Sequence, residues 1–305
     1  MDNTNKKIYT DEETTKISTS EDNNPEQIDI DIKNREEQTK VVTNDQILED
    51  EGSKEEAKSL FDVKKIKIDA RKVIVLSDIH SNMTAFNAIL NDIKTREYDA
   101  IFCLGDLVGY YTQPNEVLNK VREIVDVCVM GNHDFALIEP EILLYSTLQE
   151  GAKIALDHNK TQVSEENKDW VSKLPMKIIV ETPYSSVTLV HGDPVTIFGY
   201  IYGVTDQLFE QSINNALMQI DTDYLMVGHS HLQGEYFSDF GKVYVNPGAV
   251  GQPRDKDPRA AYAIVDLATR SHELIRVPYD IAEVKEMVIE CCFPVYLADR
   301  LEVGE

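Results

Sequence analysis

The chain has 305 residues, of which 42% are hydrophobic, enough for a substantial core in one large domain or two small ones. Its 54 acidic and 30 basic residues give a formal net charge of −24, which argues against binding to the phosphate backbone of long nucleic acid. No stretch approaches the roughly 20 apolar residues of a membrane span, and the four cysteines lack C-x-x-C spacing, so we expect a cytoplasmic protein without membrane contacts.

The first 64 residues differ in composition from the rest of the chain. They are rich in charged and polar side chains, poor in aromatic ones, and have no sustained helical or strand period. Such a segment cannot bury enough apolar surface to offset the entropy lost on ordering. We therefore predict a disordered acidic tail over residues 1–64 and a folded domain over residues 65–305. The tail is interpreted first as a solvated spacer, with a segment that binds a protein partner as the alternative.

The first half of the folded domain alternates short apolar runs with helical patterns. Asn82 is a suitable helix cap, and the apolar residues that follow it recur with helical spacing. A proline opens the second helical pattern, in the position that a first turn tolerates. We predict strands at 72–76, 100–104 and 125–130, and helices at 83–93 and 114–124. This alternation is typical of a parallel sheet whose functional residues lie at the carboxyl ends of the strands.

The second half of the domain is mostly strands. We predict helices at 143–158, 164–174 and 206–220, and strands at 177–180, 187–190, 224–227, 234–237, 242–245, 260–266 and 272–277. The first two strands are close enough for a hairpin, and the mixture suggests two sheets packed face to face with helices outside. Two C-terminal helices, 283–291 and 294–301, are interpreted as core cover or as a self-association face, which leaves a homo-oligomer open.

Five short motifs of acidic and histidine residues each follow an apolar run. They are Asp78-Ile79-His80, Gly105-Asp106, Gly131-Asn132-His133-Asp134, His191-Gly192-Asp193 and Gly228-His229-Ser230-His231. One such motif alone is weak evidence, because Gly-Asp is usually a turn. All five in order supply enough oxygen and nitrogen ligands for two divalent ions, which indicates a metal-dependent phosphoester hydrolase.

The spacing of the motifs suggests how two ions would be held. Residues i and i+2 of an extended segment point to the same side, so Asp78 and His80 are expected to address one ion together. Asp106 is the best placed bridging carboxylate, because it can hold both ions and offset their repulsion. We assign Asp78, His80, Asp106 and His231 to one ion, and Asp106, Asn132, His191 and His229 to the other.

Two ions leave room for a bridging water, whose lowered pKa would supply hydroxide for attack on phosphorus. His133 directly follows a ligand and is expected to point toward the substrate, as the general acid for the leaving group or as a stabiliser of phosphoryl charge. Asp134 is its candidate partner.

Three further residues are candidate substrate contacts: Asn82, Tyr110 and Arg254. Arg254 lies in a loop rich in glycine and proline, where a guanidinium can clamp a phosphate with two hydrogen bonds. A salt bridge from Arg254 to Asp255 or Asp257 is the equal alternative.

In the order of these motifs, the chain resembles the calcineurin-like metallophosphoesterases. The family pattern is Asp-x-His, Gly-Asp, Gly-Asn-His-Asp/Glu, His and Gly-His-x-His, which this chain matches with Asp78, His80, Asp106, Asn132, His133, His191, His229 and His231. The resemblance covers about residues 72–301 and implies a four-layer α/β/β/α sandwich of two mixed sheets flanked by helices. It also implies a binuclear metal centre that holds manganese, our first choice, or iron, nickel or zinc.

Within that family the chain is most similar to the compact bacterial and archaeal phosphodiesterases. It shares with them the stretches 105–110 (GDLVGY), 114–117 (PNEV) and 246–254 (NPGAVGQPR). Serine/threonine protein phosphatases instead carry an Asp and an Arg where this chain has Gly109 and Tyr110. This departure argues against a protein phosphatase, and it removes the carboxylate that usually accompanies the histidine equivalent to His133.

We therefore predict a metal-dependent phosphodiesterase or phosphatase that acts on a small phosphoester, with a nucleotide as one candidate substrate. A non-catalytic metal-binding scaffold of the same fold is the alternative, because related folds include a retromer subunit that serves as a protein-binding platform. A nuclease acting on long DNA or RNA comes third, since the acidic charge opposes it.

Overall fold

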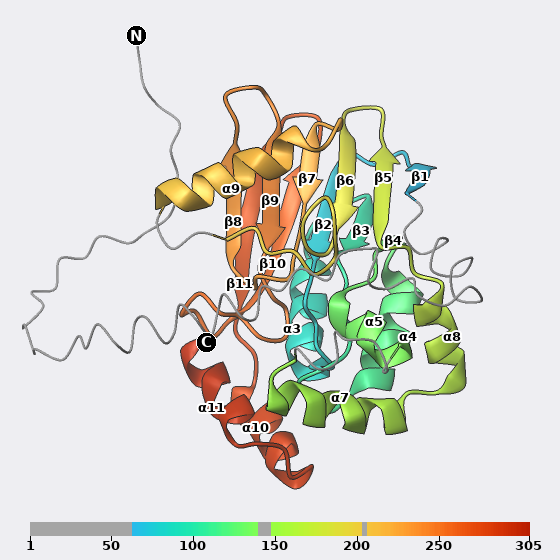
Figure 1. The fold of residues 1–305 in the computed structure, drawn as a ribbon, viewed down its shortest axis with the longest axis vertical. Coiled ribbons are helices and arrows are strands. Elements are labelled where there is room, and N and C mark those ends of the chain that lie inside the picture. Colours follow the sequence, from blue (N-terminus) through green and yellow to red (C-terminus); the bar gives the residue numbers. More distant parts are fainter. Residues whose placement is uncertain (1–62, 140–147, 203–205) are drawn as a thin grey trace, which may run out of the picture.

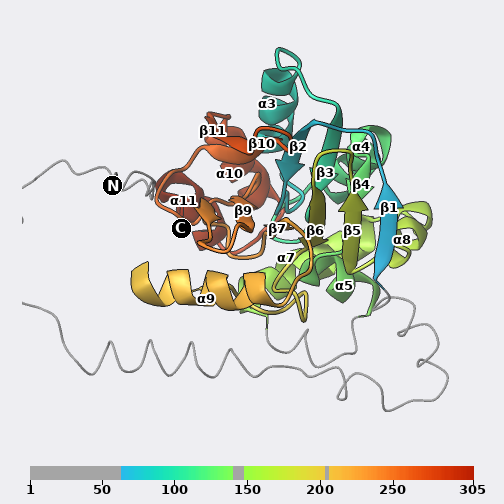
Figure 2. The ribbon, with the colours of Figure 1, turned by 90° about the horizontal axis from the view of Figure 1, so that it is seen from above.

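The computed structural model describes residues 63–139, 148–202 and 206–305. Two mixed β-sheets pack face to face, and helices cover their outer sides (Figures 1 and 2). This architecture confirms the predicted sandwich of two mixed sheets flanked by helices. Residues 1–62 of the predicted tail lie outside the described residues.

The five-stranded sheet carries the first three motifs. Its strand order is β11-β10-β2-β3-β4, with β2 (Lys72–Leu76), β3 (Ala100–Cys103) and β4 (Val127–Cys128) parallel to one another. β10 (Ala260–Asp266) pairs antiparallel with β2, and β11 (Ser271–Val277) pairs antiparallel with β10. The β4 strand is shorter than the predicted 125–130, because Val125 N–H still bonds to Val121 O of the preceding helix at 2.9 Å and Met130 N–H donates to Pro175 O at 2.9 Å.

The six-stranded sheet carries the last two motifs. Its order is β1 (Lys64–Lys67), β5 (Lys177–Glu181), β6 (Ser186–Val190), β7 (Tyr224–Met226), β9 (Val243–Pro247) and β8 (Gln233–Phe237). β5 and β6 form the predicted antiparallel hairpin, whereas β7 runs parallel to β6. The edge strand β1 was not predicted, because its sequence, KKIK, is mostly exposed and lacks an apolar period.

Helices lie on opposite sides of the two sheets (Figure 2). α3 (Met83–Ile93) contacts β10 and β11, whereas α9 (Asp206–Met218) contacts β9 of the other sheet. The other helices among the described residues are α4 (Pro114–Ile124), α5 (Asn132–Ile138), α7 (Glu150–Gln162), α8 (Glu165–Ser172), α10 (Ile281–Glu290) and α11 (Tyr296–Val303). Across the described residues, every helix is too short or too polar to cross a membrane.

Both faces of β2 are covered, which explains its continuous apolar run. Val73 and Val75 point into the core between the two sheets, together with Val187 of the facing sheet. Ile74 and Leu76 point the other way, into a core that includes side chains of α3. A strand packed on both faces cannot shift its register without burying different residues. The position at which the loop after Leu76 begins is therefore fixed.

A buried carboxylate at the end of β10 gives a test of the fold that depends on pH. Asp266 accepts hydrogen bonds from Arg71 Nε at 3.1 and 3.2 Å and from the N–H groups of Ala268 and Thr269 at 3.0 Å each. The hydrogen bond with Arg71, more than any other contact, lowers the pKa of Asp266 to about 2.

We expect Asp266→Asn to lower the free energy of unfolding by about 1–2 kcal/mol at pH 7. Because the pKa is lower in the folded protein than in the unfolded chain, the stabilisation is present above about pH 4 and is lost as the pH falls through about 2. Thermal melting at pH 7 and at steps between pH 4 and pH 2 measures this. The exposed Asp239→Asn is the control, and a difference independent of pH would contradict the prediction.

Candidate metal centre

All seven predicted ligands follow the carboxyl ends of strands and meet at one place, six of them on loops and Asn132 at the first residue of α5. Asp78 and His80 follow β2, and Asp106 follows β3. The others, in the same way, are Asn132 after β4, His191 after β6, and His229 and His231 after β7. Each of the seven side chains is buried. Parallel neighbours in each sheet bring these strand ends together, as the sequence predicts.

The backbone aims these side chains in a way that the sequence did not indicate. Asp78, His80, Asp106, His229 and His231 have φ angles of 54°, 51°, 53°, 64° and 60°. They adopt the left-handed conformation, which costs roughly 1–2 kcal/mol per residue. The extended backbone expected for Asp78 and His80 from their i and i+2 spacing is therefore wrong. The turn is held from the neighbouring loop, where Asp78 N–H donates to Gly105 O at 3.0 Å and His80 N–H donates to Asp106 O at 3.0 Å.

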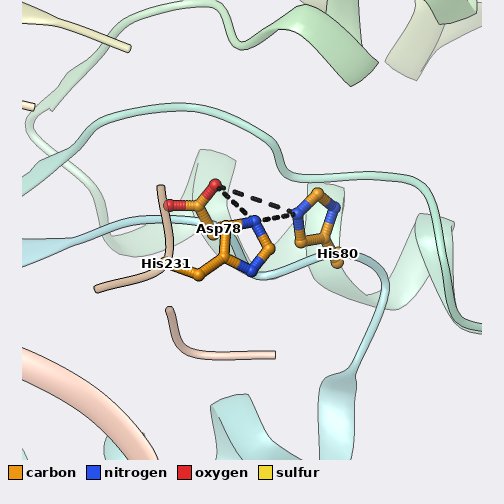
Figure 3. Close-up of side chains that lie close together, drawn as sticks. All are labelled: Asp78, His80 and His231. Atoms are coloured by element: carbon orange, nitrogen blue, oxygen red, sulfur yellow. Dashed lines mark hydrogen bonds and ion pairs between the residues drawn. The ribbon is translucent and has the colours of Figure 1, made fainter. Parts of the chain in front are cut away.

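The first cluster of donor atoms consists of one carboxylate and two imidazoles that face one another (Figure 3). His80 Nε2 lies 3.1 Å from His231 Nε2. Asp78 Oδ1 lies 3.2 Å from His231 Nε2 and 3.8 Å from His80 Nε2. Two donor atoms that share an ion at a bond length near 2.1 Å are about 3.0–3.4 Å apart, so this spacing fits a metal ion.

The protonation of these histidines supports that reading. Nδ1 lies 2.9 Å from Val108 O in His80, 2.5 Å from Gln252 O in His231, and 2.7 Å from Leu104 O in His191. A carbonyl oxygen only accepts, so each Nδ1 carries a proton and each Nε2 is the atom that faces the centre, with a lone pair in the neutral rings of His80 and His231. Lone pairs of two Nε2 atoms repel at 3.1 Å, and a cation between them converts that repulsion into coordination.

The second cluster surrounds His191 Nε2. Asn132 Oδ1 lies 3.0 Å from this atom, His229 Nδ1 lies 3.1 Å from it, and Asp106 Oδ2 lies 3.2 Å from it. The same Asp106 oxygen lies 3.6 Å from His80 Nε2 in the first cluster. Asp106 Oδ2 therefore faces both clusters, as expected of a carboxylate shared by two ions.

The charges around the centre suit a cation. Burial lowers the pKa of His80, His229 and His231 well below the ordinary value, so these rings are neutral ligands. Burial also disfavours charge on His191, but the Asp106 carboxylate outweighs it and raises the pKa of His191 to about 9. Within the described part of the chain, the buried atoms Asp78 Oδ1 and His229 Nε2 have no hydrogen-bond partner.

His133 lies beside the first cluster, in the first turn of α5, a helix that the sequence did not predict. Its ring centre is 4.9 Å from that of His80 and 4.9 Å from that of Tyr110. The backbone N–H of His133 donates to Asp106 Oδ1 at 2.8 Å. Burial lowers the pKa of His133. A Cβ atom on Gly109, whose φ is +94°, would lie 2.4 Å from His133 Nδ1, so only glycine leaves room for this ring.

Asp134, the candidate partner of His133, lies elsewhere. Its Oδ1 accepts from Leu107 N–H at 2.8 Å and from Val108 N–H at 3.3 Å, and its Oδ2 accepts from Gly131 N–H at 3.0 Å. It fixes the loop after β3 to the start of α5. Burial raises the pKa of Asp134 to about 7, with the charge of Asp106 adding to the effect.

Arg254 faces the centre without forming either predicted salt bridge. Its Nε and Nη2 donate to Gln252 Oε1 at 3.1 and 2.7 Å, and Nη2 also donates to Tyr110 OH at 3.1 Å. Asp255 instead pairs with Arg276, and Asp257 pairs with Arg259. Among the described residues, no carboxylate forms an ion pair with Arg254. A half-buried guanidinium held only by neutral groups can still pair with an anion.

The side chain of Asn82, in contrast, is hydrogen-bonded to the backbone through both of its polar atoms. Its Oδ1 accepts from Ala85 N–H at 3.0 Å, which caps α3 as predicted, and its Nδ2 donates to Gly251 O at 2.9 Å. The residue is 1% exposed. These contacts fix Asn82 as a link between the loop after β2 and the loop that carries Arg254.

Two residues near the centre were not predicted from the sequence. Tyr200 places its ring centre 3.9 Å from that of His229. The aromatic stretch 198–202 was the only signal for it. Asn159 of α7 joins the loop after β2 to the loop after β3, and nothing in its sequence context indicates this.

Asn159 makes three hydrogen bonds inside the protein. Its Oδ1 accepts from Ser81 Oγ at 2.9 Å and from Gly109 N–H at 2.7 Å, and its Nδ2 donates to Tyr111 O at 2.8 Å. We expect Asn159→Ala to lower the free energy of unfolding by about 2–4 kcal/mol, because these groups lose their buried partner. Urea denaturation followed by circular dichroism measures it. The exposed Asn87→Ala on α3 is the control, and equal stability of the two variants would contradict the prediction.

Comparison with known proteins finds a matching family model and similar proteins of known sequence or structure. The sequence model of the calcineurin-like phosphoesterase superfamily domain matches residues 72–270. An uncharacterised protein of Methanocaldococcus jannaschii is 35% identical over 249 residues, which cover 76% of this chain and 98% of that protein. The crystal structure of a metallophosphoesterase from Sphaerobacter thermophilus is 30% identical with a TM-score of 0.65, covering 78% of this chain and 100% of the other.

A hypothetical protein of Pyrococcus horikoshii has the same fold. Its crystal structure has a TM-score of 0.67 at 22% identity, and the match covers 77% of this chain and 98% of the other.

Proposed function

We propose that this chain, which belongs to the calcineurin-like phosphoesterase superfamily, hydrolyses a small phosphoester with the help of two bound divalent metal ions. The observation that carries the proposal is the arrangement of donor atoms. His80 Nε2 and His191 Nε2 lie 3.6 and 3.2 Å from Asp106 Oδ2, and His231 Nε2 lies 3.1 Å from His80 Nε2, spacings that fit shared coordination. Imidazole nitrogens beside carboxylates bind divalent cations such as manganese, iron, nickel or zinc.

The residues would divide as two sets of ligands. Asp78, His80 and His231 would hold one ion, Asn132, His191 and His229 would hold the other, and Asp106 would touch both. Bound ions of this kind supply a water of lowered pKa as the nucleophile and offset the charge on the phosphoryl oxygens. The protein itself keeps the rings of His80, His229 and His231 neutral and available. It orients the rings of His80, His191 and His231 through their Nδ1–H contacts with backbone carbonyls.

Two other side chains would act on the substrate. Arg254 would donate hydrogen bonds to phosphoryl oxygens, since its guanidinium has no carboxylate partner in the described part of the chain. His133 would approach the ester oxygen that leaves as its bond to phosphorus breaks, and would donate a hydrogen bond or a proton to that oxygen. The net charge of −24 favours a small substrate over a polynucleotide.

Turnover of bis-p-nitrophenyl phosphate tests the proposal. We expect the purified protein to release p-nitrophenolate with added manganese, to lose that activity on dialysis against EDTA, and to regain it with at least one of manganese, iron, nickel or zinc. Metal content is measured on the same samples. A folded protein that binds two ions and hydrolyses neither this diester nor p-nitrophenyl phosphate would argue strongly for a non-catalytic role.

A further inference from the structure

The loop that follows His191 is built around Asp193, a residue of the fourth motif that the metal centre does not use. Asp193 Oδ1 accepts from the N–H groups of Val195 and Thr196, both at 2.8 Å, and its own N–H donates to Thr196 O at 3.0 Å. A Cβ atom on Gly199 would lie 1.8 Å from Asp193 Oδ2. The loop therefore folds tightly back on itself and returns the chain to the metal centre.

Buried residues fix the end of this loop before and after Tyr200. Ile197 and Ile201 are 2% and 4% exposed and belong to the hydrophobic core, whereas Tyr200 is 50% exposed. One face of the Tyr200 ring packs on His229, with 3.9 Å between ring centres and 31° between planes. A half-exposed ring with one face covered leaves the other face open to a ligand, and the two anchors fix its position before any ligand binds.

A second phenol stands over the other cluster of donor atoms. The ring centre of Tyr110 lies 4.7 Å from that of His80, and Arg254 lies over this ring at 5.5 Å. Tyr110 is 7% exposed, so its ring is largely covered and far less available for stacking than that of Tyr200. Beside the centre there are thus one guanidinium for an anion and one half-exposed aromatic ring.

We propose that Tyr200 is a specificity-determining residue that stacks on a flat unsaturated ring of the substrate, while Arg254 holds its phosphate. The substrate is then a phosphoester whose organic group carries a nucleobase or an aryl ring, in preference to an alkyl phosphoester. Stacking of this kind tolerates any flat ring, because each has a π-face. This inference rests on the proposed hydrolysis of phosphoesters at the same centre.

Three diesters with the same leaving group separate ring recognition from chemistry. They are thymidine 5′-(p-nitrophenyl phosphate), phenyl p-nitrophenyl phosphate and ethyl p-nitrophenyl phosphate. We expect Tyr200→Leu to lower kcat/KM by about tenfold more for an ester whose non-leaving group carries a ring than for the ethyl ester. Tyr200→Phe should keep the preference for such an ester over the ethyl ester. An effect on the thymidine ester alone identifies a nucleobase, and an effect on both identifies any flat ring. Equal losses on all three esters, together with equal losses of binding of thymidine 5′-monophosphate and methyl phosphate, would overturn the inference, because they would show that Tyr200 only supports His229.

Tyr184→Leu is the matched control, since Tyr184 is 48% exposed and lies at the β5–β6 turn, away from the metal centre. It should leave all three rates unchanged. Calorimetric binding of thymidine 5′-monophosphate and of methyl phosphate gives a second readout without turnover. Tyr200→Leu should weaken only the former, by about tenfold. Hydrolysis of none of the esters would refute the proposed function, whereas hydrolysis without ring preference, together with equal binding, would refute this inference alone.

Discussion

Asp106→Asn is expected to lower kcat/KM for bis-p-nitrophenyl phosphate by at least about a thousandfold. Asp106 Oδ2 lies near both histidine clusters, 3.6 Å from His80 Nε2 and 3.2 Å from His191 Nε2. An amide oxygen in its place is neutral, so it binds both ions more weakly and no longer offsets the repulsion between them. Steady-state kinetics and metal analysis after dialysis should show loss of activity and loss of bound metal together.

The asparagine variant is chosen because it can keep the fold. Asp106 Oδ1 accepts a hydrogen bond from the backbone N–H of His133 at 2.8 Å, and the amide carbonyl oxygen of asparagine can accept the same bond. Asp239→Asn, on the exposed turn after β8, changes the net charge equally and should retain full activity. A folded Asp106→Asn protein with normal metal content and activity within tenfold of the original would exclude a shared bridging role for this carboxylate.

The order of strands and motifs could be predicted because it depends on local patterns. The predicted strands 72–76 and 260–266 and the predicted helix 114–124 agree with β2, β10 and α4. A strand packed on both faces has a continuous apolar run, and a proline marks the first turn of a helix. Once parallel strands are expected, the meeting of the motifs at their carboxyl ends follows from topology alone.

The aim of each ligand could not be predicted, because contacts distant in sequence determine it. The spacing rule placed Asp78 and His80 on one extended segment, yet both adopt positive φ. Hydrogen bonds from their N–H groups to carbonyl oxygens of the loop after β3 hold this backbone conformation. A local rule for side-chain direction fails where tertiary contacts set the backbone conformation, which is common at functional sites.

The residues that surround the ligands were missed for the same reason. Asp134 stands next to His133 in sequence, but it faces the backbone of the loop after β3. Tyr200 packs on His229 from the far end of the loop that begins at His191, and Asn159 bonds to the loop after β3 from a helix without a metal motif. Adjacency in sequence favours a contact only when both side chains leave the same side of the backbone, and the first turn of a helix separates successive side chains.

His133→Asn is expected to lower kcat by about 10²–10³-fold for diphenyl phosphate and by much less for bis-p-nitrophenyl phosphate. Phenolate is a poorer leaving group than p-nitrophenolate and depends more on a donated proton or hydrogen bond. Burial lowers the pKa of His133, so the neutral ring acts mainly as a donor near pH 7. His158→Asn on α7 is the control. Equal losses for both esters would contradict the leaving-group role and assign His133 to the phosphoryl oxygens, whose charge both reactions share.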